Sequence, residues 1–476
     1  MVWHRVSPEL GDGSAKKEDA APAGADTTSR KPRRNFLSSC LSLFGLASLS
    51  YLLGAAVIFF DLPSSSFLRR AFVGGAAWYE QKQETPPPPE QPPPITVGQI
   101  DKPDKTFDGF TLCLSSGGPR AVLVNMRGEV VHQWYAPFKT VWFDLQPRLR
   151  VPVKESEVYF NDGHLYPNGD LLVLVEGPGN ARHLAESYGL VKMDKDSRVL
   201  WKYSAGCHHG FDVGEDGTIY ALSYDFVKDL PPGLEYIPTP CIVDCVDVIS
   251  PDGKLVKRLP LLQAFKDSPF GPLFSTLEKP WLFRDLTPPE SPMPAAQDEM
   301  RRRDVLHTNA VKVLSKALAP KFPFFKAGQL LISPRHLDVL AVLDPDSGKV
   351  VWAVHGPWHA QHDPSFLDNG RILLFDNLGS PRGSRVLEYD PRTQAFPWSY
   401  PDNNGTPFFS RIRGGTQRLP NGNTLIVNSA EGELFEVTPS REVVWTCSCG
   451  RVSLNCARRF SPHQLSFLKG DQRARP

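Results

Sequence analysis

The sequence predicts an all-β fold, a six-bladed β-propeller preceded by an N-terminal transmembrane helix. Two observations indicate the propeller: a phrase that recurs along the chain, and a Trp that ends the last strand of several repeats. A third observation, an uncharged apolar segment, indicates the helix. The phrase is a leading residue, about eight residues, a turn Gly and an apolar run. Its copies run from Asn161 to Gly169, from His209 to Gly217, from His307 to Gly328 in a longer form, from His362 to Gly370 and from Gly414 to Gly422.

Each copy continues as a propeller blade requires. The turn Gly usually follows Asn or Asp, which suits a hairpin that needs a positive φ. A β-rich run such as LLVLV (171–175) or RILLF (371–375) comes next, and a second strand and turn follow it. Several units then close with a strand that ends in Trp134, Trp201, Trp352 or Trp445. Counting these units predicts about six blades between residues 105 and 450.

The N-terminal segment differs from the rest in composition. Residues 1–35 are polar and poor in aromatic residues, so we expect a disordered cytoplasmic tail. Residues 36–61 are almost free of charge and long enough for a transmembrane helix, with a cleaved signal peptide as the alternative. A basic cluster precedes this segment and places the N-terminus in the cytoplasm. The sequence thus predicts a single-pass membrane protein whose propeller is lumenal or extracellular.

Three further segments lie outside the repeat. Residues 62–104 contain a Pro-rich run that predicts a stiff, extended linker. Residues 262–303, rich in Pro and charge, interrupt the blade that opens at His209, and we expect a loop or lid there. Residues 451–476 are assigned to a C-terminal tail.

Charge and cysteine content narrow the class of protein. The formal net charge is +1, which does not favour nucleic acid as a partner. Eight Cys residues fit an oxidising compartment. Two groups, Cys241 with Cys245 and Cys447 with Cys449 and Cys456, are candidates for disulfides, and buried thiols are the alternative.

Five residues form the candidate site: His209, His307, Asn309, Arg335 and His362. Three are His residues that open copies of the phrase, so a propeller brings them to one central channel. A set of His, Asn and Arg suits a tetrahedral anion, and a neutral His is also a nucleophile for sulfuryl or phosphoryl transfer. A metal site, or ordinary core and turn histidines, are the alternatives. Strand alternation is expected to turn the adjacent histidines away, and no carboxylate is assigned to the set.

The phrases HHGFDVGEDG, VLHTNAV, ISPRHLDVL and QHDPSFLDNGRILLFDN, together with the last repeat, resemble the arylsulfotransferase family of six-bladed propellers over about 105–446. The resemblance implies sulfuryl transfer from an aryl sulfate to a phenolic acceptor through a sulfohistidine, with no cofactor and no metal. It implies that His362 is the nucleophile, that His209, His307 and Arg335 bind sulfate, and that Asn309 assists. The alternatives are a non-catalytic binding scaffold with an anion pocket, and a metal-dependent propeller enzyme.

Overall fold

The structure is a computed structural model of the chain. It describes residues 45, 48–52, 96–145, 153–177, 187–237, 239–276, 304–380, 383–402, 405–448 and 453–468. The chain divides into two compact units, Met1–Arg69 and Arg70–Pro476. In the first unit the described residues are helical, and the rest of the predicted span 36–61 lies outside the described residues. Within the described ranges we find no helix with the length and apolar character that crossing a membrane requires.

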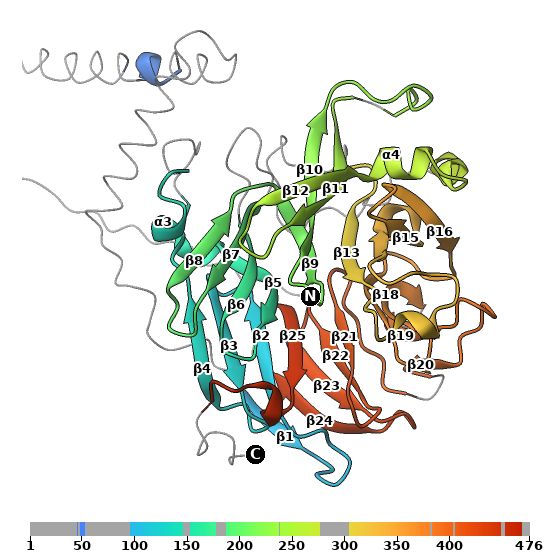
Figure 1. Cartoon of the computed structure of the whole chain (residues 1–476). Helices are drawn as coiled ribbons and strands as arrows, with labels where there is room; N and C mark the ends of the chain where they lie inside the picture. The colour runs from blue at the N-terminus through green and yellow to red at the C-terminus, as the bar shows by residue number, and fades with distance from the viewer. Residues whose placement is uncertain are drawn as a thin grey trace, which may run out of the picture. The chain divides into compact units, whose positions relative to one another are not determined.

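The second unit contains six antiparallel sheets arranged around a centre, as the sequence predicted (Figure 1). The first sheet contains β25 (Leu454–Phe460), β2 (Phe110–Ser115), β3 (Arg120–Val124) and β4 (Val130–Tyr135). The second contains β5 (Tyr159–Leu165), β6 (Leu171–Glu176), β7 (Ser187–Met193) and β8 (Val199–Tyr203). The third contains β9 (Cys207–Val213), β10 (Ile219–Val227), β11 (Cys241–Ile249) and β12 (Leu255–Pro260).

The chain then forms the three remaining blades. The fourth contains β13 (Thr308–Val313), β14 (Leu330–Pro334), β15 (Val339–Asp344) and β16 (Lys349–His355). The fifth contains β17 (His362–Phe366), β18 (Ile372–Ser380), β19 (Gly383–Tyr389) and β20 (Trp398–Tyr400). The sixth contains β21 (Gly415–Arg418), β22 (Thr424–Asn428), β23 (Glu433–Val437), β24 (Val443–Ser448) and the added outer strand β1 (Thr96–Ile100). Short helical segments are α3 (Phe138–Val141), η2 (Glu155–Glu157), α4 (Leu261–Lys266), η3 (Gly271–Thr276), η5 (Ala319–Lys321), η6 (Arg335–Leu337) and η7 (Pro462–Gln464).

Two pairings between distant parts of the chain close the ring. β25 pairs with β2 and is the innermost strand of the first blade, while β1 pairs with β24 at the outer edge of the last blade. The assignment of 451–476 to a tail is therefore wrong for Leu454–Phe460. The reason is that this strand starts no repeat of its own, because it supplies the inner strand of a blade that begins more than 300 residues earlier. The six inner strands β5, β9, β13, β17, β21 and β25 contact one another in sequence around the centre.

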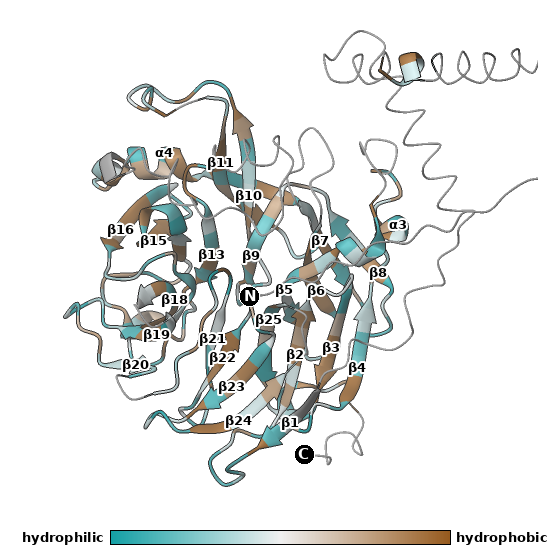
Figure 2. Ribbon diagram, turned by 180° about the vertical axis from the view of Figure 1, so that it is seen from behind, coloured by the Kyte–Doolittle hydropathy of each residue, from teal (hydrophilic) through white to brown (hydrophobic). Residues whose placement is uncertain are grey.

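The repeated turn Gly and the strand-ending Trp both have structural reasons. Gly169, Gly217, Gly370 and Gly422 have φ between +79° and +88°, as the turn pattern predicted. The Trp134 indole donates a hydrogen bond to the carbonyl of Gly169 in the next blade, at 3.0 Å. The strands carry many apolar residues, coloured brown in Figure 2, and each buried cluster lies between two neighbouring blades. The interfaces between blades are therefore the hydrophobic core of the protein.

The insert is part of this core where the structure describes it. α4 follows β12 directly, and Figure 1 shows it beside the third and fourth blades. Leu262 and Phe265 on α4, and Phe274 on η3, are almost fully buried in the cluster between these blades. The prediction of a loop or lid is wrong for 262–276, because apolar residues at helical spacing were masked by the surrounding Pro and charge. Residues 277–303 lie outside the described residues.

Candidate functional site

The site is built where the inner strands begin. β9, β13 and β17 each have a register irregularity in their pairing with the second strand of the blade. Residues at these starts have left-handed backbone, with φ of +60° at His209, +48° at His307, +45° at Asp363 and +59° at Arg413 just before β21. Non-Gly residues adopt this conformation at a cost, and such residues concentrate at functional sites. The sequence placed His209 and His307 there through the repeat alone.

His362 is held in one neutral tautomer. Its Nδ1 lies 2.7 Å from Asn377 Oδ1 and 2.9 Å from the Ala360 carbonyl. Asn377 Nδ2 donates to the carbonyls of Ser410 and Arg413, at 2.8 and 2.6 Å, so the amide cannot turn and its Oδ1 must accept. The proton therefore sits on Nδ1, and Nε2, which makes no hydrogen bond with the described residues, carries a lone pair. Burial, with the nearby Arg335 charge, lowers the pKa of His362 to about 3.

His209 is paired with the histidine before it. The two Nδ1 atoms of His208 and His209 are 2.7 Å apart, so one proton lies between them. The His209 N–H donates to Glu176 Oε1 at 2.9 Å, which fixes the strained backbone. Burial, and then the neighbouring His307, hold the pKa of His209 well below its usual range.

His307 forms an ion-pair geometry with a carboxylate. Its Nδ1 lies 2.5 Å from Asp304 Oδ2, and its backbone N–H donates to Asp304 Oδ1 at 3.0 Å. The His307 ring packs edge-on against His209, with centroids 4.6 Å apart, and stacks on His336 at 4.8 Å. Burial opposes ionisation of Asp304, but the interactions with His307 outweigh it and hold the Asp304 pKa well below its usual range.

Arg335 and Asn309 flank these rings. Arg335 opens η6 directly after β14, as expected, and its charge lowers the pKa of both His362 and His336. Asn309 is buried, and its Nδ2 donates to the Gln361 carbonyl at 2.7 Å. The structure therefore brings the three predicted histidines and Arg335 into one electrostatic cluster, and Asn309 links β13 to the residue that precedes β17.

Two expectations about the surroundings of the site are wrong. His208 and His336 do not turn away, because the left-handed residue at His209 breaks strand alternation and His336 lies in a helical turn rather than a strand. A carboxylate, Asp304, does belong to the set. Its signal in the sequence was its position three residues before His307, at the edge of the insert.

Sequence reasoning also missed Arg413. Its guanidinium contacts Asn455 Oδ1, Ser116 Oγ at 3.2 Å and Tyr159 OH at 3.1 Å. Its positive charge is one of the causes that lower the pKa of His209. The available signal was its place directly before Gly414, which opens a copy of the repeat.

None of the cysteines considered as disulfide candidates is among the five predicted site residues. Cys241 and Cys245 lie on one strand, about 13 Å apart at the usual rise per residue, so they cannot form a disulfide with each other. Cys449 lies outside the described residues. Among the described residues, no group of three or more His, Cys, Asp or Glu side chains has an arrangement that could hold a metal ion.

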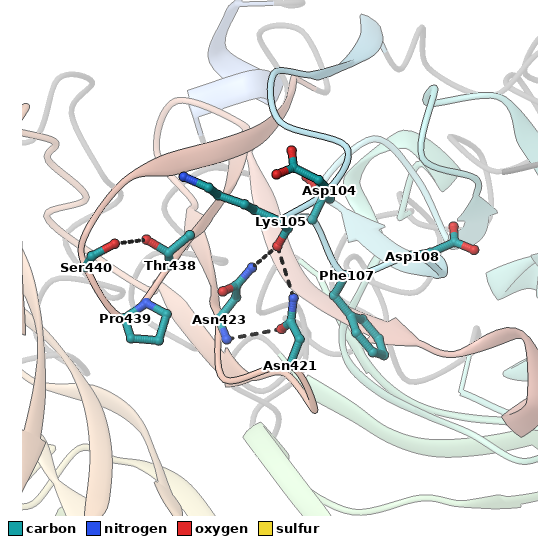
Figure 3. A pocket seen from close by; sticks show the side chains of 10 residues that line it. Asp104, Lys105, Phe107, Asp108, Asn421, Asn423, Thr438, Pro439 and Ser440 are labelled. Atoms are coloured by element: carbon teal, nitrogen blue, oxygen red, sulfur yellow. Dashed lines mark hydrogen bonds between the residues drawn. The ribbon is translucent and has the colours of Figure 1, made fainter.

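A hollow of about 460 Å³ lies elsewhere, at one end of the sixth blade (Figure 3). It lies between the segment at 104–108 and the turns at 421–423 and 438–440. Asn421 and Asn423 donate there to the Lys105 carbonyl at 3.2 and 2.7 Å. These bonds pin the N-terminal segment to the blade, and none of the five candidate site residues lines the hollow.

With this geometry established, the chain can be compared with known proteins. It matches the arylsulfotransferase (ASST) family over residues 165–450, more than half of its length, and belongs to that family. No curated protein matches it. A solved structure of unknown function from Bacteroides caccae is 14% identical, with 73% of this chain and 97% of that chain covered and a TM-score of 0.44. A streptogramin B lyase is 9% identical, with 78% and 95% covered and a TM-score of 0.39. A virginiamycin B lyase from Staphylococcus aureus is 8% identical, with 75% and 98% covered and a TM-score of 0.39. Such distant likenesses carry no argument about chemistry.

Proposed function

We propose that this protein transfers a sulfuryl group from an aryl sulfate to a phenol through a covalent sulfohistidine at His362. The family membership supports the substrate class. The observation that carries the mechanism is the Asn377 amide, locked by two carbonyls, which leaves the lone pair of His362 on Nε2. A pKa of about 3 keeps this nitrogen unprotonated at neutral pH.

The first half-reaction forms a bond between His362 Nε2 and sulfur as the bond between sulfur and the aryl oxygen breaks. Negative charge then shifts from the sulfuryl group towards the departing aryloxide. In this proposal the Arg335 guanidinium and the His307 ring bind the sulfuryl oxygens in both the reactant and the transition state. In the second half-reaction the acceptor phenol attacks the same sulfur and restores His362.

The test is intact-mass analysis of the purified protein after mixing with 4-nitrophenyl sulfate and no acceptor. We expect the mass of one SO₃ group to appear on His362 and to disappear when a phenol is added. His362→Asn should abolish labelling. Arg335→Lys should slow it roughly 10²–10³-fold, because Lys lacks the planar fork that matches two sulfuryl oxygens.

A matched control is His359→Gln, an exposed histidine in the same blade as His362 whose ring contacts Asp338. It should label at the wild-type rate. If the wild-type protein never gains the sulfuryl group, a non-catalytic scaffold with an anion site replaces this proposal. If His362→Asn still gains it normally, another residue is the nucleophile.

A further inference from the structure

Transfer between two phenols requires one proton to change hands twice. In the first half-reaction the aryloxide needs a proton if its parent phenol is a weak acid. In the second, the acceptor phenol must lose a proton as its oxygen attacks sulfur. A single group that gives up a proton in the first half and regains it in the second satisfies both requirements.

The contact between His208 and His209 has the properties of such a group. The Ser223 carbonyl, 3.2 Å from His208 Nε2, can only accept, so this nitrogen carries a proton. The shared proton between the Nδ1 atoms then allows two states. With His208 neutral, the proton belongs to His209 Nδ1, and His209 Nε2 offers a lone pair. With His208 charged, His208 donates the proton, and His209 Nε2 carries a hydrogen.

A buried carboxylate lies behind His208. Asp244 is almost fully buried, and its Oδ2 accepts the Thr308 backbone N–H at 2.6 Å. Its Oδ1 makes no hydrogen bond with the described residues, yet lies 3.6 Å from His208 Nε2. An unsatisfied buried carboxylate oxygen is costly. This cost falls when His208 is protonated, because the imidazolium then faces a compensating charge.

We propose that His208 and Asp244 form a proton relay behind His209, which protonates the first phenol on release and deprotonates the second. This inference rests on the proposed function. In the first half-reaction His209 Nε2–H passes its proton to the aryloxide, and the shared proton moves from His208 to His209 Nδ1. In the second half-reaction the acceptor proton arrives at His209 Nε2, and the shared proton returns to His208. One proton leaves and one returns per cycle.

The His307–Asp304 pair is less suited to this task. Asp304 Oδ2 lies 2.5 Å from His307 Nδ1, and the interactions with His307 outweigh burial and hold the pKa of Asp304 well below its usual range. The Asp304 carboxylate therefore stays ionised and does not exchange a proton during the cycle. In the relay His208 is the group that changes charge, and Asp244 Oδ1 lies 3.6 Å from its Nε2. The titratable and charged groups that surround the relay are Glu176, Tyr224, Cys245, Asp304, His307, His362 and Arg413.

The test compares two donors in the full-length protein and in the variants His208→Gln and Asp244→Asn. 4-Nitrophenyl sulfate releases a stable aryloxide, whereas phenyl sulfate releases one that needs a proton. We expect His208→Gln to label His362 from 4-nitrophenyl sulfate within severalfold of the wild-type rate. Labelling from phenyl sulfate should fall roughly 10²-fold or more, the usual contribution of a general acid. The ratio of the two rates is measured within one preparation, so it does not depend on the folded fraction.

The pH profile supplies a second measurement. With phenyl sulfate, the wild-type rate should fall as pH rises and the relay loses its proton. Asp244→Asn removes the charge that stabilises protonated His208, so the fall should move to lower pH. The matched control is His336→Gln, which removes a ring that stacks on His307 and is not part of the relay. It should change the labelling rates from both donors by the same factor.

If His208→Gln slows labelling from both donors equally, or slows labelling from neither, the relay is overturned. Labelling of His362 in the same experiment would still uphold the proposed function. An unmoved pH profile in Asp244→Asn would remove Asp244 from it. Absence of labelling in the wild-type protein by either donor would overturn the proposed function, and the relay with it.

Discussion

Replacing Asn377 by Leu should separate the positioning of His362 from its chemistry. The substitution keeps the side-chain shape but removes three buried hydrogen bonds, to His362 Nδ1 and to the carbonyls of Ser410 and Arg413. At about 1 kcal/mol each, the free energy of unfolding should fall by about 3 kcal/mol. His362 keeps its bond to the Ala360 carbonyl, so the reactive tautomer persists. Losing one bond to the nucleophile, worth about 1–1.5 kcal/mol, should slow labelling roughly 10-fold.

The assay is the rate of His362 labelling by 4-nitrophenyl sulfate, together with denaturant unfolding. Ser384→Ala is the matched control, because the Ser384 hydroxyl accepts from the Ser410 N–H at 3.0 Å and contacts the carbonyls of Asn377 and Ser410. It destabilises the same loop without touching His362, so labelling should stay close to the wild-type rate. Equal slowing in both variants, or wild-type labelling in Asn377→Leu, would show that the Asn377 bond does not position the nucleophile.

Phe265→Ala should lower the free energy of unfolding by about 3–5 kcal/mol in denaturant titration, because this α4 side chain fills the cluster between two blades; a smaller effect would place α4 outside the core. Burial and nearby charges lower the pKa of half-buried His336 and of buried His362 to about 3, so only the unfolded chain binds their protons as pH drops below about 6.5. As pH falls from about 6 to about 4, the free energy of unfolding should therefore fall by about 1.4 kcal/mol per pH unit for each of these two histidines. His336→Phe should halve their joint contribution to this slope. The segment 36–61 should keep the full-length protein in the membrane fraction after alkaline carbonate washing, and release of a shorter soluble species would indicate a cleaved signal peptide.

Much of the architecture was predictable because a blade is a local unit. The turn Gly, the β-rich run and the strand-ending Trp all act within a few tens of residues, so their spacing predicted six blades. The same register predicted that His209, His307 and His362 converge, and the structure places them together. β25 and α4 were not predictable in this way. The first pairs with a strand at the other end of the chain, and the second is buried only because two blades meet over it.

What the sequence alone determined is thus the repeat, the handful of residues that open each inner strand, and the family. The tertiary structure decided how those residues are arranged. Strand alternation is a rule for regular backbone, and the left-handed residues at the strand starts break it, which brings His208 beside His209. Asn377 lies on β18, which pairs with the strand of His362, and Asp244 lies on β11 in the same blade as His208, so the folding of each blade brings them within reach. The carbonyls of Ser410 and Arg413, which fix the Asn377 amide, come from the segment that leads into the next blade. Tautomer and charge depend on such contacts across space, because hydrogen bonding and burial are properties of the folded site.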